Sequence, residues 1–217
     1  MTVPLSEGDA KPPPIWQVRR VNLTSLAALD TAMAEFRRRL ATVAEGDWGA
    51  PTPCPDWDVR FLVAHVVGGN RFAARVLGGA TAAEAMEFVM GTAQLGAVPI
   101  DDFDASAAAQ RDEFGRTGAL ERVVSHPLGD MPAARFLRMR VFDVAVHAWD
   151  LAVSLGRDAT LDEGLVDTVI AIVQQEAPGM GFGIEPCGKV GPGANPMDLL
   201  LDLTGRCTEP VQADHRW

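Results

Sequence analysis

The sequence predicts an all-α protein, a bundle of four principal helices with extra short helices and a loop-rich C-terminal segment. Two observations support this fold class. Every long periodic stretch repeats its apolar residues at intervals of three and four, which is the period of a helix and not of a strand. The segments between these stretches are rich in glycine and proline, which end helices and form turns.

The four principal helices are expected in four separate segments of the chain. The first covers residues 25–43 and carries one apolar stripe that faces a core. The second covers residues 59–77 and follows Asp58, whose side chain is a good N-cap. The third covers residues 103–114, and the fourth covers residues 133–155. This order predicts an antiparallel bundle.

Shorter elements are expected between and after these helices. A short helix is predicted to start near Thr81. Thr160 and Glu163 have the spacing of a capping box, which predicts the start of a further helix there. The glycine- and proline-rich residues 179–195 lack periodicity and predict a long surface loop. Residues 196–205 then form a short closing helix.

The composition predicts a globular chain with flexible ends. Residues 1–20 are expected to form a flexible leader, residues 21–210 a single helical-bundle domain, and residues 211–217 a tail. No apolar run is long enough to predict a membrane-spanning helix. The formal net charge of −10 argues against binding to nucleic acids and to anionic membranes. The basic run at Arg37–Arg39 is interpreted as the solvated face of a helix.

The cysteines indicate a reducing compartment. Cys54, Cys187 and Cys207 are too few and too scattered for a disulfide framework, and none belongs to a C-x-x-C pair. We therefore expect a cytoplasmic location. Cys54 lies between two prolines, and it is either a buried structural thiol or a reactive nucleophile.

The most informative segment is RVFDVAVHAWDLA, residues 140–152. Asp143, His147 and Asp150 interrupt an otherwise apolar run at spacings of four and three. At about 100° per residue, the three side chains lie within about 60° of one another on one side of a helix. A helix that is apolar on its other sides is normally buried, and an unpaired buried carboxylate costs several kcal/mol. These groups must therefore be paired with one another, hydrogen-bonded elsewhere or bound to a metal.

A second histidine is a candidate partner for this stripe. His65 lies in an equally apolar run of the second principal helix, one turn before Gly68 and Gly69. These glycines either leave open space beside the imidazole or allow close helix packing. If the second and fourth principal helices face each other, His65 meets Asp143 and His147. Two imidazoles and one carboxylate suit Zn²⁺ with an open fourth position, or a ferrous site.

Three further residues are candidates for supporting roles. Asp150 is expected to accept a hydrogen bond from His147 and fix its tautomer, or to be an added ligand. Arg140 lies one turn before the stripe and is a candidate for holding a substrate carboxylate or for pairing with Asp143. Asn70, on the second principal helix, is a candidate for lining the same cavity. We predict Arg140 and Asn70 as the cofactor-binding residues.

Two segments resemble a known family. WGAPTPCPDWDVRFLVAHVVGGNRF and HPLGDMPAARFLRMRVFDVAVHAWDLAVSLGRDATL are similar to the DinB-like superfamily, in the branch typified by mycothiol-dependent maleylpyruvate isomerase. The resemblance spans roughly residues 22–205. It implies a DinB-like four-helix bundle that binds a divalent metal, commonly zinc, through His65, Asp143 and His147. It also implies one departure, because the isomerase carries a glutamate where this chain has Asp143.

The resemblance implies a function for this site. It indicates a metal-dependent reaction of a low-molecular-weight thiol such as mycothiol, either thiol transfer to a small electrophile or its isomerisation. Such chemistry is coherent because a metal-bound thiol loses its proton and becomes a nucleophile at neutral pH. The implied partners are a small-molecule substrate, the thiol and a second copy in a homodimer. The alternative, favoured by the change to Asp143, is a non-catalytic metal- or ligand-binding bundle with a decayed site.

Overall fold

The computed structural model describes residues 26–176, 185–191 and 193–206. The predicted leader and tail lie outside these residues. A 3-10 turn, η2 (Glu45–Asp47), follows the first helix, and a short antiparallel hairpin pairs β1 (Val123–Val124) with β2 (Met131–Pro132). The α-helices of the described residues are α1 (Leu26–Leu40), α2 (Val59–Leu77), α3 (Ala82–Gly91), α4 (Pro99–Gly115), α5 (Ala133–Ser154), α6 (Glu163–Glu176) and α7 (Pro196–Leu203).

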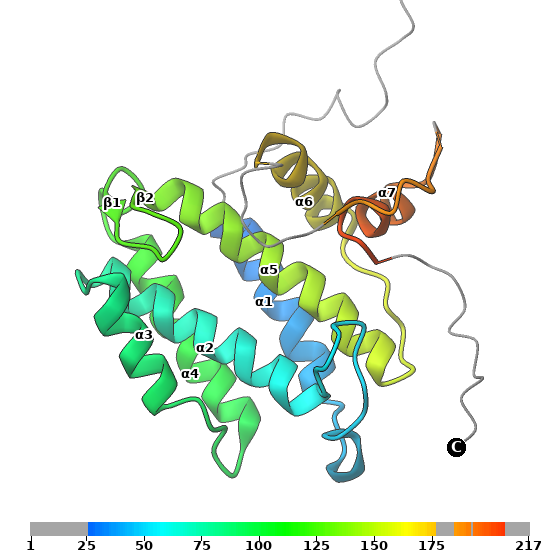
Figure 1. The fold of residues 1–217 in the computed structure, drawn as a ribbon, viewed down its shortest axis with the longest axis horizontal. Coiled ribbons are helices and arrows are strands. Elements are labelled where there is room, and N and C mark those ends of the chain that lie inside the picture. Colours follow the sequence, from blue (N-terminus) through cyan, green and yellow to red (C-terminus); the bar gives the residue numbers. More distant parts are fainter. Residues whose placement is uncertain (1–25, 177–184, 192, 207–217) are drawn as a thin grey trace, which may run out of the picture.

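Helices α1, α2, α4 and α5 form the four-helix bundle (Figure 1). Within it, α1 packs against α4 and α5, and α2 also packs against α4 and α5. The short helix α3 packs on α2. Helix α6 packs against α5 and α1, and α7 packs against α6. The predicted bundle of four principal helices with extra short ones is therefore confirmed. None of the helices in the described ranges has the length and apolar character needed to cross a membrane.

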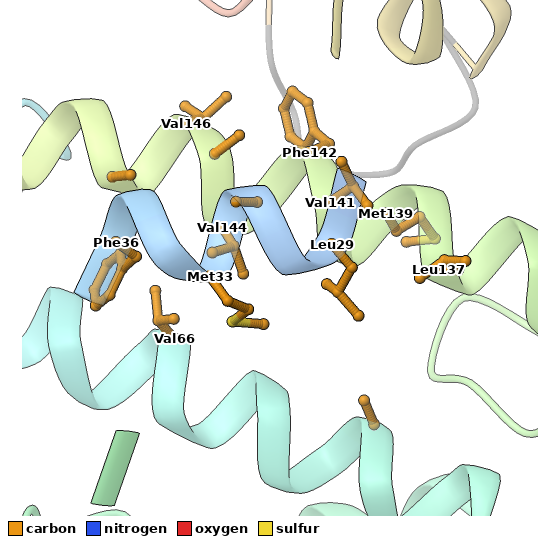
Figure 2. Close-up of a cluster of buried hydrophobic side chains, with 14 of the residues drawn as sticks. Leu29, Met33, Phe36, Val66, Leu137, Met139, Val141, Phe142, Val144 and Val146 are labelled. Atoms are coloured by element: carbon orange, nitrogen blue, oxygen red, sulfur yellow. The ribbon is translucent and has the colours of Figure 1, made fainter. Parts of the chain in front are cut away.

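One part of the core lies between α1, α2 and α5 (Figure 2). Leu29, Met33 and Phe36 belong to the predicted apolar stripe of α1, and they point into this space. Val66 of α2 and Val144 of α5 meet them there, and all five side chains are buried. The periodicity of the first principal helix therefore identified the face that packs against the rest of the bundle.

Helix α5 is buried around nearly its whole circumference. Helices α1 and α2 pack against it, and α6 packs against it as well, so few positions remain for solvent. This position explains why its sequence is apolar on almost every side. The polar side chains of α5 must therefore find their partners inside the protein, and Arg140, Asp143, His147 and Asp150 are all buried.

Helix α2 has the predicted N-cap, whereas helix α6 begins with a different cap from the one predicted. Asp58 caps α2, because its carboxylate accepts a hydrogen bond of 2.7 Å from the backbone amide of Phe61. The predicted capping box at Thr160 is wrong. Asp162 caps α6 instead, since its carboxylate accepts a hydrogen bond of 2.9 Å from the backbone amide of Leu165. Helix α6 therefore begins later than the sequence pattern predicted.

The basic run of α1 also differs from the expectation. Arg37 and Arg38 are exposed, as predicted for a solvated face, but Arg39 is buried. Its guanidinium pairs with Glu35 and donates a hydrogen bond of 2.7 Å to the carbonyl oxygen of Thr160. Arg39 therefore ties α1 to the loop before α6.

Candidate metal site

His65, Asp143 and His147 meet where α2 contacts α5. The Nε2 atom of His65 lies 3.2 Å from Oδ1 of Asp143, and Nε2 of His147 lies 3.4 Å from the same oxygen. The two imidazole rings are edge-on to each other, with their centroids 5.0 Å apart. The structure therefore brings together all three side chains that the sequence predicts as metal ligands.

The spacing of these donor atoms fits a tetrahedral cation. Ligands at about 2.0–2.1 Å from a tetrahedral zinc ion lie about 3.3–3.4 Å from one another. The distances of 3.2 and 3.4 Å agree with this value, and the three donor atoms all lie within 4.8 Å of one another. Asp143 thus reaches both imidazoles even though its side chain is one methylene shorter than glutamate. The same distances are those of hydrogen bonds, so protons and a metal ion compete for these atoms.

A buried network of polar side chains holds Asp143 at Oδ2, the carboxylate oxygen that does not face the imidazoles. Arg140 Nη1 donates a hydrogen bond of 2.7 Å to Oδ2 of Asp143, which leaves Oδ1 to face the imidazoles. Arg140 Nε donates to Gln110 of α4 at 2.9 Å, and Nη2 donates to the side-chain oxygen of Asn70 at 2.8 Å. Both amide side chains are fully buried. The guanidinium therefore has a fixed position, and it fixes the carboxylate in turn.

Asn70 and Arg140 lie in the interior of the bundle. The amide of Asn70 donates to Ser106 at 3.1 Å, and its oxygen accepts from Gln110 at 3.0 Å as well as from Arg140. The contacts in the structure are thus with protein groups. Binding of a cofactor by either residue stays a prediction, whereas the observed contacts give both residues a role in holding Asp143.

The two glycines of α2 make room for neighbouring side chains. A Cβ atom added to Gly69 would lie 2.8 Å from Cζ of Arg140. A Cβ atom added to Gly68 would lie 3.2 Å from Cγ1 of Val89 on α3. Of the two alternatives that the sequence left open for these glycines, the structure shows close packing and not open space beside His65. Gly68 allows close packing of α3 on α2, and Gly69 admits the guanidinium that holds the site.

Replacing Gly69 with alanine is expected to destabilise the protein. The added methyl group forces Arg140 away from Asp143, and such overpacking costs about 1–3 kcal/mol, more than the gain of up to about 1 kcal/mol in helix propensity. Urea-induced unfolding measures the difference. Gly46→Ala is the control, because a Cβ atom there meets nothing within 4 Å. A Gly69→Ala protein as stable as the Gly46→Ala protein contradicts the packing argument.

Asp150 lies at the other ring nitrogen of His147. Oδ2 of Asp150 is 2.9 Å from Nδ1 of His147, opposite the nitrogen that faces Asp143. A carboxylate in this position accepts a hydrogen bond from Nδ1–H and leaves the lone pair of Nε2 free for a metal ion. Arg206, from the segment after α7, donates to Oδ2 and Oδ1 of Asp150 at 2.7 and 3.1 Å. Oδ2 of the buried carboxylate thus contacts both His147 and Arg206.

Charges inside the site shift the pKa values of its groups. Burial by itself raises the pKa of Asp143, but Arg140 together with His65 and His147 holds that pKa well below its usual range. Burial by itself lowers the pKa of His147, but Asp143 and Asp150 raise it well above its usual value. The two carboxylates thus favour the imidazolium form of His147 in the metal-free site, and a cation that bound Nε2 would compete with the proton there.

The loop at residues 51–58 covers the two imidazoles. The backbone amide of Thr52 donates to the carbonyl oxygen of Trp57 at 3.0 Å, which closes the loop. The Trp57 ring centroid lies 4.8 Å from that of His65 and 5.6 Å from that of His147. Trp57 is half-buried against both histidines.

Cys54 belongs to the same loop and lies behind His147. Its Sγ atom is 3.4 Å from Oδ2 of Asp150 and 3.9 Å from Nδ1 of His147, so these three residues form a second group of potential ligands. Arg206 is 3.8 Å from Sγ, and its positive charge disfavours a cation there. Among the described cysteines, Cys54 is free.

Sequence reasoning missed Gln110 and Arg206. Gln110 had a detectable signal, because it shares the buried face of α4 with Ser106 and Phe114, and a polar residue within a buried stripe needs an interior partner. Arg206 had no such signal. Its contact with Asp150 joins residues 56 positions apart in the chain, and no local pattern specifies that contact.

Comparisons with known proteins match the chain to one family model and to relatives of similar sequence. A family model described as the mycothiol maleylpyruvate isomerase N-terminal domain matches residues 29–152, which include all three candidate ligands. Two uncharacterized proteins of Mycobacterium tuberculosis, Rv0738 of strain ATCC 25618 / H37Rv and MT0763 of strain CDC 1551 / Oshkosh, are similar in sequence. Each is 33% identical over 188 residues, which cover 83% of this chain and 98% of the relative.

Solved structures share the fold. The mycothiol-dependent maleylpyruvate isomerase superposes with a TM-score of 0.55 at 20% identity, over 73% of this chain and 71% of that chain. A mutant of that isomerase, with one histidine replaced by alanine, gives a TM-score of 0.56 at 19% identity with the same coverage. At this level of identity the likeness establishes the architecture and leaves the chemistry to the residues of the site.

Proposed function

Because this chain belongs to the family of the mycothiol maleylpyruvate isomerase N-terminal domain, we propose that it is a divalent-metal-dependent enzyme that uses a low-molecular-weight thiol. Its fold is the DinB-like four-helix bundle that the resemblance implied. The single observation that supports the metal is the convergence of His65, Asp143 and His147 at the spacing of a tetrahedral site. Mycothiol is the expected thiol, because it is named in the family and in the structural relatives.

In this proposal His65, Asp143 and His147 would hold the ion, and zinc is the expected metal because two imidazoles and one carboxylate are a common zinc donor set. A divalent ion, when bound, would supply Lewis-acid chemistry and favour the thiolate form of a thiol ligand. Three protein ligands would leave room at the ion for the thiol or a small electrophile. The proposed reaction is thiol transfer to that electrophile or its isomerisation.

Two residues next to the proposed ligands hold them in a fixed orientation. Arg140 balances the charge of Asp143 and orients it, while Asp150 orients His147. The His65 side chain is 36% exposed, whereas those of Asp143 and His147 are each 10% exposed. A small substrate therefore has access on the side of His65, and the other two ligands stay shielded from water.

The second candidate function is a non-catalytic metal- or ligand-binding bundle. The hydrogen-bond lengths between Asp143 and the two imidazoles favour it, because the three groups satisfy one another without an ion. Metal binding and thiol chemistry together separate the two candidates. A protein that binds zinc but neither consumes the thiol nor isomerises the electrophile supports the non-catalytic bundle.

Metal analysis tests the proposal directly. Zinc-reconstituted and dialysed wild-type protein is expected to retain about one zinc ion per chain, as a site with three protein ligands does. His65→Ala and His147→Ala are expected to lose most of this zinc. His126→Ala is the matched control, because this histidine contacts Phe72 and Phe136 and not the site. Wild-type protein without bound zinc contradicts the proposal.

An activity assay completes the test. The protein is incubated with mycothiol and a small electrophile such as maleylpyruvate, and thiol consumption and isomerisation are both followed. Either reaction is expected in the zinc-loaded wild type and is expected to disappear after chelation and in His147→Ala. Equal rates with and without the chelator contradict a metal-dependent enzyme.

A further inference from the structure

We infer that Arg206 is a positioning residue for this site, so that the segment after α7 completes a metal centre whose ligands come from α2 and α5. The inference deepens the proposed function and rests on it for the identity of the metal. It starts from one observation, namely that a residue near the end of the described chain reaches a fully buried carboxylate beside a candidate ligand.

The end of α7 directs Arg206 toward α5. The backbone amide of Arg206 donates to the carbonyl oxygen of Leu201 at 2.8 Å, and that of Gly205 donates to Asp202 at 3.2 Å. These two bonds form a Schellman motif, with Gly205 in the left-handed region at a φ of 71°. The guanidinium of Arg206 also donates to the carbonyl oxygen of Thr204 at 2.8 Å. The chain is thus turned at Gly205, and the Arg206 side chain is held at the turn.

Arg206 engages Asp150 through two nitrogen atoms. Nη2 lies 2.7 Å from Oδ2 and Nε lies 3.1 Å from Oδ1, so the planar guanidinium faces both carboxylate oxygens. The Arg206 side chain is 14% exposed, and that of Asp150 is fully buried. Bidentate pairs between arginine and a carboxylate fix the plane of the carboxylate as well as its charge.

The fixed carboxylate then orients His147. Oδ2 of Asp150 accepts from Arg206 at 2.7 Å and lies 2.9 Å from Nδ1 of His147 at the same time. If Arg206 is removed, the Asp150 carboxylate loses the partner that sets its plane, and His147 loses the fixed acceptor that holds its ring. The effect of Arg206 on Asp143 and the metal therefore passes through two intermediate residues, without direct contact.

Two substitutions of Arg206 test this role. Arg206→Gln removes the charge and the bidentate pairing, and it is expected to weaken zinc binding about tenfold or more, the range found when groups that orient a ligand are lost. Arg206→Lys keeps the charge without the planar fork, and its zinc affinity is expected to lie between those of wild type and Arg206→Gln. Competition with a chromophoric chelator measures the dissociation constants.

Arg138→Gln is the matched control. Arg138 has a side chain that is 15% exposed, and its Nε donates at 2.8 Å to Glu176, which is likewise a buried carboxylate. The pair ties α5 to α6 away from the metal ligands. Its loss is expected to lower the thermal midpoint while the zinc affinity stays at the wild-type value.

A readout in the metal-free protein separates positioning from general destabilisation. The imidazole ¹⁵N and ¹H resonances of His147, assigned by their absence in His147→Gln, are expected to shift or broaden in Arg206→Gln and to stay unchanged in Arg138→Gln. A folded Arg206→Gln protein with wild-type His147 resonances and wild-type zinc affinity overturns the inference. If Arg206→Gln does not fold, wild-type values of both in Arg206→Lys overturn it.

The same experiment distinguishes this inference from the proposed function. Wild-type protein that binds no zinc contradicts the proposed metal-dependent function. If the His147 resonances nevertheless change in Arg206→Gln, the positioning of His147 by Arg206 is supported. Zinc bound with equal affinity by wild type and Arg206→Gln, with unchanged His147 resonances, supports the metal and overturns the role of Arg206.

Discussion

Replacing Arg140 with leucine is expected to lower the free energy of unfolding by about 3–5 kcal/mol, the usual cost of leaving one partner of a buried ion pair uncompensated. Arg140 is buried and donates hydrogen bonds to Asp143, Gln110 and Asn70. Leucine fills part of the space but donates nothing, so a buried carboxylate and two buried amides lose a partner. Urea-induced unfolding in the presence of a chelator measures this cost without a contribution from metal.

Arg37→Leu is the control for the loss of an ion pair. Arg37 pairs with Asp104 at 2.7 Å, but their side chains are 51% and 40% exposed. Its loss is expected to cost at most about 1 kcal/mol, since water screens exposed pairs. The double variant Arg140→Leu with Asp143→Leu is expected to recover part of the stability, because no unpaired charge remains. An Arg140→Leu protein as stable as Arg37→Leu contradicts the argument.

The loss in the free energy of unfolding caused by Arg140→Leu is expected to be smaller in acid. Burial opposes ionisation of Asp143, but Arg140 and the two histidines hold its pKa well below the unfolded value of about 3.9. A carboxylate whose pKa is depressed in the folded state contributes stability above the unfolded pKa and loses it as the pH falls through the folded pKa. The difference between wild type and Arg140→Leu is therefore full near neutrality and decreases below about pH 4. Urea-induced unfolding of wild type and Arg140→Leu, near neutral pH and below about pH 4, measures this difference.

Zinc is expected to stabilise the wild-type protein by about 2.7 kcal/mol at about 100 times its dissociation constant. The physical reason is that the folded chain brings His65, Asp143 and His147 together, whereas the unfolded chain separates α2 from α5. His65→Ala is expected to remove this stabilisation. Its effect on the metal-free protein is expected to be small, because the His65 side chain is partly exposed. Unfolding with zinc and with a chelator gives both quantities.

His126→Ala provides the comparison for zinc stabilisation. It removes a histidine that packs on Phe72 and Phe136, so it lowers the stability of the metal-free protein but keeps the increment produced by zinc. If zinc stabilises His65→Ala as much as wild type, the ion binds elsewhere and the site assigned to α2 and α5 is wrong.

Local patterns predicted most of the helices because helical periodicity and end signals act over a few residues. The apolar stripe of α1 and the cap at Asp58 are examples, since each depends on neighbours within a turn. The start of α6 was wrong because Thr160 and Asp162 are both competent caps. In the structure, the backbone of Thr160 is bound by Arg39, and Asp162 takes the capping position. A contact between distant segments therefore decided between two local alternatives.

The candidate site also combines features set by local sequence with features set by contacts between distant segments. The sequence by itself determined that α5 carries Asp143, His147 and Asp150 on one face, because their spacing on a helix sets their direction, and that a buried helix requires partners for them. Only the tertiary structure decided which partners these are. Asp143 received His65 and Asp150 received Arg206, because packing of α2 and of the segment after α7 against α5 brings distant residues within hydrogen-bond range. Such contacts depend on how helices pack, and helix packing depends on the whole chain and not on any single segment.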